Sequence, residues 1–396
     1  PDRPFRLPGA RGVAAGPRPF FVPGLGIARP PCQPATGKRG RASMTIPVFD
    51  GHNDFLLRLW RSPGERARLW QGGEGRGHLD LPRMRAGGFA GGLFAIYVPS
   101  PDGDRPGDLD AAMEVPPFAL PLPAPLTLAE AQPVALAQAA HLLALARDFP
   151  ADIALCRSVA EIRSAIAEGR IAAVMHMEGA EAIDEGLDAL YAFHAMGLRS
   201  LGPVWSRPTV FGHGVPFAFP SDPDTGPGLT EAGRRLVAAC NKLRILIDLS
   251  HLNAAGFDDV ARLSDAPLVA THSNAHALTP SSRNLTDRQL DAIRDTGGVV
   301  GLNFATVFLR PDGGRSPDMT WDPVLRHLDH LLDRLGEDGV ALGSDFDGAT
   351  LPAPLGDVAG LPALTAAMAD HGFGPALVGK ICQGNWLALL GRVWGG

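Results

Sequence analysis

Eight short apolar runs follow one another after Met44, and nearly every run ends in polar or ionisable residues before a longer helical stretch begins. Their β-branched content is typical of buried strands. Stretches such as 126–149, 159–168, 230–242 and 323–335 have the apolar spacing of helices. The runs cover residues 46–54, 91–99, 171–179, 197–205, 244–251, 267–274, 298–304 and 339–348. This alternation predicts an α/β fold, a (β/α)8 TIM barrel.

A doubly wound open sheet is the alternative fold. Such a sheet usually carries a glycine-rich phosphate-binding turn after its first strand, and no such turn follows residues 46–54. Two connections are long: about 70 residues after the second run, and the Pro/Gly-rich stretch 206–229 after the fourth. Long loops on one face of a barrel usually form lids or walls, so we expect the substrate to bind beneath them.

The first 43 residues differ in composition from the rest of the chain. They are rich in Pro, Gly and Arg and show neither helical nor strand periodicity. We expect 1–43 to be a disordered leader, which would not be translated if Met44 is the true start. Residues 44–396 are expected to form a single barrel domain.

Charge and cysteine content narrow the functional class. The formal net charge is −6, so the chain lacks the basic field of a nucleic-acid binder or of a protein held on anionic lipid. No signal-like or membrane-spanning apolar stretch is present. The four cysteines stand far apart without a CxxC pair, which argues against a thiolate metal site and favours a reducing compartment. We therefore expect a cytoplasmic protein with a small-molecule substrate, no nucleic acid and no membrane as partners.

Ionisable side chains gather where the runs end. His52 and Asp54 close the first run, and a strand directs both toward the same face. The carboxyl ends of all strands of a barrel open on one mouth, where catalytic residues collect. Later runs add four more candidates to that mouth: Glu178, His251, His272 and Asp345.

Three histidines and three carboxylates exceed the three protein ligands of a single catalytic zinc. Two ions are therefore implied, with Glu178 as the best candidate for a shared carboxylate and a hydroxide bridging the pair. Imidazole and carboxylate ligands without thiolate suit Zn²⁺ first, with manganese or iron also open.

The motifs FDGHND, MEG, DLSH, THSNAH, SRN and GSDFDG, in this order and spacing, resemble those of the membrane dipeptidase (renal dipeptidase) family of zinc metallopeptidases. The resemblance runs from about Val48 to the C-terminus. It implies a barrel of the metal-dependent hydrolase type, and an enzyme that cleaves dipeptides with a free C-terminal carboxylate. By similarity, His52 and Asp54 hold one zinc, His251 and His272 hold the other, and Glu178 bridges them.

The resemblance also implies residues that contact the substrate. Arg283 matches an arginine that grips the substrate carboxylate, and Asp345 matches an aspartate that exchanges protons with the bridging water and the leaving amine. Tyr97 matches a position near the substrate. Where the family often has a histidine that polarises the scissile carbonyl, this chain has Trp205, which offers only an indole N–H. His213 in the following loop could supply the missing group.

Other functions and other histidines stay open at this point. The same metal site suits an amidohydrolase acting on an N-acyl amino acid, a lactam or a lactone, and Trp205 also suits a catalytically impaired barrel that binds a ligand. We expect His176 to be an interior histidine, Asp347 to be a weaker site candidate than Asp345, and His327 to lie on an outer surface.

Family members in vertebrates are attached to membranes by a C-terminal lipid anchor. This chain ends in GRVWGG without the required hydrophobic tail, so we expect no such attachment. Whether the chain forms a homodimer stays open.

Overall fold

The computed structural model describes residues 46–73, 75–101 and 111–395, and the expected leader 1–43 lies outside these ranges. Each predicted run overlaps one strand. The strands are shorter than the runs, so the polar residues at the run ends lie at or just beyond the strand ends. The eight strands are β1 (Val48–Asn53), β2 (Phe89–Ile96), β5 (Ile171–Met177), β6 (Leu198–Leu201), β8 (Leu246–Ile247), β9 (Val269–Ala270), β10 (Val299–Leu302) and β11 (Val340–Leu342).

These eight strands run parallel and close into a ring in chain order. Strands β1, β2, β5, β6 and β8 form one hydrogen-bonded path, and β9, β10 and β11 form another. A parallel bridge between Asp248 and Val269 joins β8 to β9, and a second bridge, between Asn53 and Phe346, joins β1 to the segment after β11. The predicted (β/α)8 barrel is confirmed, and the open sheet is excluded.

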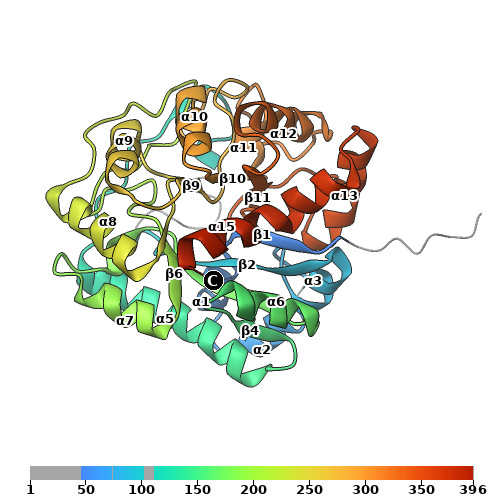
Figure 1. Ribbon diagram of the computed structural model, residues 1–396, viewed down its shortest axis with the longest axis horizontal. Helices are drawn as coiled ribbons and strands as arrows, with labels where there is room; N and C mark the ends of the chain where they lie inside the picture. Colours follow the sequence, from blue (N-terminus) through green and yellow to red (C-terminus); the bar gives the residue numbers. More distant parts are fainter. Residues whose placement is uncertain (1–45, 74, 102–110, 396) are drawn as a thin grey trace, which may run out of the picture. The chain divides into compact units, whose positions relative to one another are not determined.

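Helices cover the outside of the ring (Figure 1). The four predicted helical stretches correspond to α5, α6, α8 and α12. The helices are α1 (Phe55–Trp60), α2 (Arg66–Trp70), α3 (Leu81–Gly87), α5 (Leu128–Asp148), α6 (Val159–Ala167), α7 (Asp188–Met196), α8 (Glu231–Leu243), α9 (Ala254–Leu263), α10 (Asp287–Asp295), α11 (Thr306–Leu309), α12 (Asp322–Leu335), α13 (Leu361–Asp370), α14 (Pro375–Gly379) and α15 (Asn385–Trp394). None of the described helices is both long and apolar enough to cross a membrane.

Helix α12 shows one error of the sequence analysis. Its buried face carries Val324, Leu328 and Leu331, at the three- and four-residue spacing of a helix stripe. His327 lies on the same face and is 1% exposed, so the prediction of an outer-surface role is wrong. Its Nδ1 accepts a hydrogen bond from the Ala275 amide at 3.1 Å, which stabilises the neutral ring.

Helix α15 closes the amino-terminal end of the barrel. It crosses the centre of the view in Figure 1. Its side chains donate hydrogen bonds near the starts of β11 and β10. Asn385 Nδ2 donates to the Val340 carbonyl at 2.7 Å, and Arg392 Nη2 donates to the Gly297 carbonyl at 2.6 Å. The Trp386 ring fills the interior where a Cβ on Gly51 would lie 2.5 Å from it. The opposite, carboxyl-terminal end is therefore the one available for a site.

The two long connections meet at that carboxyl-terminal end. Strand β3 (Phe118–Ala119), from the connection after β2, pairs antiparallel with β7 (Ala218–Phe219), from the connection after β6. A further strand, β4 (Ile153–Leu155), extends the sheet beside the start of β5. The small β3–β7 ribbon holds the two loops together, which fits the prediction that they wall the substrate site.

Candidate metal centre

The six residues predicted from the strand ends meet at the carboxyl-terminal mouth of the barrel. Five are buried, with relative exposures of at most 5%, and Asp345 is partly exposed. They come from five different strands or from the turns that directly follow them, so the barrel itself brings them together. The residues are His52, Asp54, Glu178, His251, His272 and Asp345.

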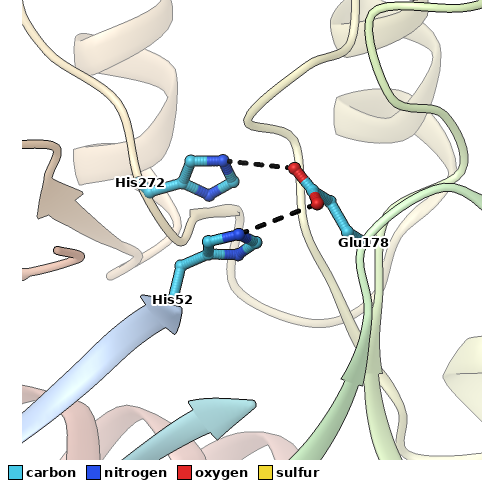
Figure 2. Close-up of side chains that lie close together, drawn as sticks. All are labelled: His52, Glu178 and His272. Atoms are coloured by element: carbon cyan, nitrogen blue, oxygen red, sulfur yellow. Dashed lines mark ion pairs between the residues drawn. The ribbon is translucent and has the colours of Figure 1, made fainter. Parts of the chain in front are cut away.

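Glu178 faces the imidazole rings of His52 and His272 with its two carboxylate oxygens (Figure 2). Its Oε2 is 3.8 Å from His52 Nε2, whereas its Oε1 is 3.1 Å from His251 Nε2 and 3.7 Å from His272 Nε2. On the first side, Asp54 Oδ2 lies 3.5 Å from His52 Nε2. On the second side, the two histidine Nε2 atoms are 3.2 Å apart. The two oxygens of one carboxylate thus face two separate donor groups.

The donor set fits divalent cations. His52 is fully buried, and neither of its ring nitrogens has a hydrogen-bond partner among the described residues. Two triads have all of their potential ligand atoms within 4.8 Å of one another: His52, Glu178 and His272, and His52, Asp54 and Asp345. A buried imidazole without a partner is costly unless something binds it, and a metal ion is the natural occupant.

The electrostatics of the site also favour positive charge. Burial raises the pKa of Glu178 well above its usual value, and burial raises that of Asp345 too. Burial alone would lower the pKa of His52, but the carboxylates of Glu178 and Asp54 outweigh it and raise this pKa to about 10. Burial keeps the pKa of His251 and His272 well below the usual value, so both rings are neutral and can offer a lone pair.

The backbone around Asp345 is shaped for close approach. Asp345 has a left-handed conformation with φ of 60°, and its amide donates to the His52 carbonyl at 3.0 Å. Asn303 Nδ2 donates to Asp345 Oδ2 at 2.9 Å. A Cβ on Gly348 would lie 2.1 Å from Asp54 Oδ2 and 2.5 Å from Asp345 Oδ1, so only glycine fits beside these carboxylates. Strained residues of this kind often mark functional sites.

A pocket of about 280 Å³ opens over the metal centre. Tyr97, Trp205 and Arg283, three of the predicted substrate contacts, line it. The rings of Tyr97 and Trp205 have centroids 5.1 Å apart, and those of Trp205 and His251 are 5.9 Å apart. The structure does not bring His213 into the lining: His213 Nδ1 lies 3.4 Å from the Gly228 carbonyl oxygen, within its own loop.

Arg283 is 3% exposed, although it faces the pocket. Its Nη1 donates to Ser273 Oγ at 2.8 Å and its Nη2 donates to the His272 carbonyl at 3.0 Å. The guanidinium lies over the Phe308 ring, 5.8 Å from the centroid. No described residue accepts from its Nε, so the arginine keeps donors for an anion in the pocket.

Two further residues have structural partners that sequence reasoning did not identify. Asp347 accepts two hydrogen bonds from Arg58 Nη1, at 3.0 and 2.8 Å, and one from the His78 amide. His176 Nδ1 lies 2.9 Å from Ser200 Oγ inside the barrel. Arg58 and Asp347 are 289 positions apart, so no local pattern could have paired them.

Comparison with known proteins agrees with this geometry. The family model for membrane dipeptidase, peptidase family M19, matches residues 40–395. A crystal structure of dipeptidase AC, a metallopeptidase of family M19, is 66% identical, covers 89% of this chain and all of that one, and has a TM-score of 0.87.

A metallopeptidase from Rhodobacter sphaeroides, solved with a phosphinate mimic of the dipeptide L-Ala-D-Ala, is also 66% identical, with a TM-score of 0.87. The match covers 88% of this chain and 100% of that one. The uncharacterized protein in the pqqA 5′ region of Klebsiella pneumoniae is 52% identical over 61% of this chain and 89% of its own length. The resemblance inferred from the motifs is confirmed: the chain belongs to the membrane dipeptidase family, peptidase family M19.

Proposed function

We propose that the protein is a binuclear zinc dipeptidase that hydrolyses dipeptides with a free C-terminal carboxylate. The observation that carries the proposal is the position of Glu178, whose Oε2 faces His52 and whose Oε1 faces His251 and His272. Family membership and two metallopeptidase structures at 66% identity support the dipeptidase activity. A phosphinate is tetrahedral at phosphorus, as the scissile carbon is after attack, so the ligand of the Rhodobacter protein supports hydrolysis of a dipeptide as the reaction.

The ligands are assigned from the two sides of Glu178. His52 and Asp54 would hold one ion, His251 and His272 the other, and Glu178 both. Neutral imidazoles and carboxylates without thiolate suit zinc. When bound, two such cations supply Lewis acidity, which polarises a carbonyl and lowers the pKa of a water molecule to about 7.

Arg283 is assigned to the C-terminal carboxylate of the substrate. A buried, planar guanidinium with unused N–H groups binds a carboxylate with two parallel hydrogen bonds, better than a lysine would. The wall beside it is apolar, since Val307 and Phe308 line the same pocket. Leu57, Tyr97 and Trp205 form a second apolar patch of the lining. A dipeptide anchored at Arg283 would place its two side chains along these patches.

Asp345 is assigned to proton transfer. It lies in the pocket, its pKa is raised by burial, and Asn303 orients its carboxylate. Such a group accepts the proton of the attacking water and delivers it to the departing nitrogen. Asp54 and Glu178, which also line the pocket, are the carboxylates assigned to the metal.

A substrate panel combined with metal analysis tests the proposal. The purified protein should contain about two zinc ions per chain, and it should cleave dipeptides faster than N-acyl amino acids, lactams or lactones. Including both L,L and L,D dipeptides covers the configuration of the ligand seen in the Rhodobacter protein. Bound zinc without hydrolysis of any amide would instead support the ligand-binding barrel, and preferred cleavage of a lactone would support the other amidohydrolase reading.

A further inference from the structure

Asp248 lies directly after β8, beneath the metal centre and outside the pocket lining. It is 3% exposed and accepts hydrogen bonds from four donors. Its Oδ1 accepts from the Ser250 amide at 3.1 Å, from Ser250 Oγ at 2.6 Å and from the Thr271 amide at 2.8 Å. Its Oδ2 accepts from Thr271 Oγ1 at 2.6 Å. Four donors and two short hydroxyl contacts make this a fully satisfied buried carboxylate.

In this arrangement the Thr271 hydroxyl donates its hydrogen to Asp248 Oδ2. A hydroxyl has one hydrogen to donate, and the carboxylate at 2.6 Å is its strongest nearby acceptor. Thr271 Oγ1 also lies 2.8 Å from His272 Nδ1. Because its own hydrogen points to Asp248, Thr271 Oγ1 can only accept at that contact. The hydrogen between them must therefore belong to His272 Nδ1.

This donor count determines the tautomer of His272. With hydrogen on Nδ1, the lone pair of the neutral ring is on Nε2, the atom that lies 3.7 Å from Glu178 Oε1. The backbone is held as well, since the His272 amide donates to Ser250 Oγ at 3.1 Å. His251 has a simpler support, a single contact of 2.9 Å between its Nδ1 and Ser206 Oγ. Of these two histidines, only His272 is tied to a carboxylate through a hydroxyl.

We propose that Asp248 and Thr271 are positioning residues, which act through His272 and hold its Nε2 ready to bind a metal ion. Outer hydrogen bonds of this kind orient a metal-binding histidine and raise its basicity, and their loss typically costs about 10- to 100-fold in metal affinity. The inference rests on the metal site of the proposed function and not on its substrate.

The hydrogen-bond relay from Asp248 through Thr271 to His272 is tested by Thr271→Val, because this variant keeps the side-chain shape and removes the hydroxyl. The holoprotein is titrated with a chelator of known zinc affinity, and retained zinc is measured. One of the two zinc affinities, that of the ion assigned to His251 and His272, should fall about 10- to 100-fold in Thr271→Val. Thr271→Ser, which restores the hydroxyl, should lose less than about tenfold in zinc affinity.

Thr279→Val is the matched control. Thr279 is also fully buried, and its hydroxyl also lies beside a buried histidine, 3.3 Å from His327 Nε2. Among the described residues, the side-chain contacts of that histidine are with Thr279 and with backbone groups, and not with an assigned zinc ligand. This variant should keep wild-type zinc affinity even if it lowers stability. Equal zinc loss in Thr271→Val and Thr279→Val would overturn the proposal, since general destabilisation would then explain both. Wild-type zinc affinity in Thr271→Val would overturn it as well.

Asp248→Asn tests the relay from its other end. If Thr271→Val does not fold, this variant tests the positioning role in its place. The amide presents a donor where one of the four hydrogen bonds needs an acceptor, so the zinc affinity should again fall at least about tenfold. Unchanged zinc binding in Asp248→Asn would contradict the relay. Zinc is the readout throughout, so a protein that binds zinc as expected but cleaves no dipeptide refutes the proposed function and leaves the relay standing.

Discussion

Arg283 offers the sharpest quantitative prediction. Of its five N–H groups, two are used within the protein, one to Ser273 and one to the His272 carbonyl, and the remaining three have no acceptor among the described residues. Two of the three suffice for a bidentate grip on a carboxylate. Hydrogen bonds to charged groups contribute about 1.5 to 3 kcal/mol each, so the pair should contribute about 3 to 6 kcal/mol, or about 10²- to 10⁴-fold in kcat/KM.

A thermodynamic cycle that combines a mutation of Arg283 with a change of the substrate isolates that contribution. Wild type, Arg283→Lys and Arg283→Met are each assayed with a dipeptide and with its C-terminal amide. In the wild type, the amide should be the poorer substrate by about 10²-fold or more, and Arg283→Met should lose most of that discrimination. Arg283→Lys should lie between them, because a point charge replaces the planar fork. Equal losses for dipeptide and amide in Arg283→Met would refute the carboxylate contact and leave Arg283 with a purely structural role.

Three further predictions concern the metal bridge, the aromatic wall and a buried histidine. Glu178→Gln should lose at least one of two zinc ions and at least about 10²-fold in kcat, measured by metal analysis and steady-state kinetics, and a fully active variant would contradict the bridge. Trp205→Phe keeps an aromatic ring but removes an indole N–H for which no described residue is the acceptor. If that N–H polarises the scissile carbonyl, kcat should fall about 10- to 100-fold with little change in KM. An unchanged kcat would mean that Trp205 only packs against its neighbours. Burial lowers the pKa of His327 to about 3. Between about pH 3 and 6.5 the folded protein therefore binds fewer protons than the unfolded chain. Through this group, the free energy of unfolding should fall by about 2 kcal/mol when the pH is lowered from 7 to 5. Denaturant unfolding at both pH values should show a smaller fall in His327→Gln, and an identical fall would contradict the assignment.

The barrel and the convergence of the site were predictable because both follow from chain order. Once eight strands alternate with helices, the carboxyl ends of all strands face one mouth, and the ionisable residues at those ends must meet. His52 and Asp54 show the limit of that reasoning. The prediction placed both on one strand, whereas Asp54 lies at the first turn after β1, and its carboxylate still comes within 3.5 Å of His52 Nε2.

Contacts without local periodicity could not be predicted. The pairing of Arg58 with Asp347 depends on how two mouth turns meet, and the position of His213 depends on a loop that folds back on its own residues. Two features of the structure did have a pattern in the sequence that the sequence analysis did not use. His327 falls at apolar stripe positions of α12, and in Thr271-His272 a hydroxyl residue directly precedes a ligand candidate. Spacing on the helix was sufficient to find the first. The second also required the distances from Thr271 to Asp248 and to His272, which only the fold supplies.

Anomalous diffraction at the zinc edge, on crystals of the active enzyme, tests the central claim most directly. Two peaks should lie on opposite sides of Glu178, one beside His52 and Asp54 and the other beside His251 and His272. A single peak, or zinc bound away from Glu178 in an enzyme that still hydrolyses dipeptides, would contradict the shared-carboxylate centre.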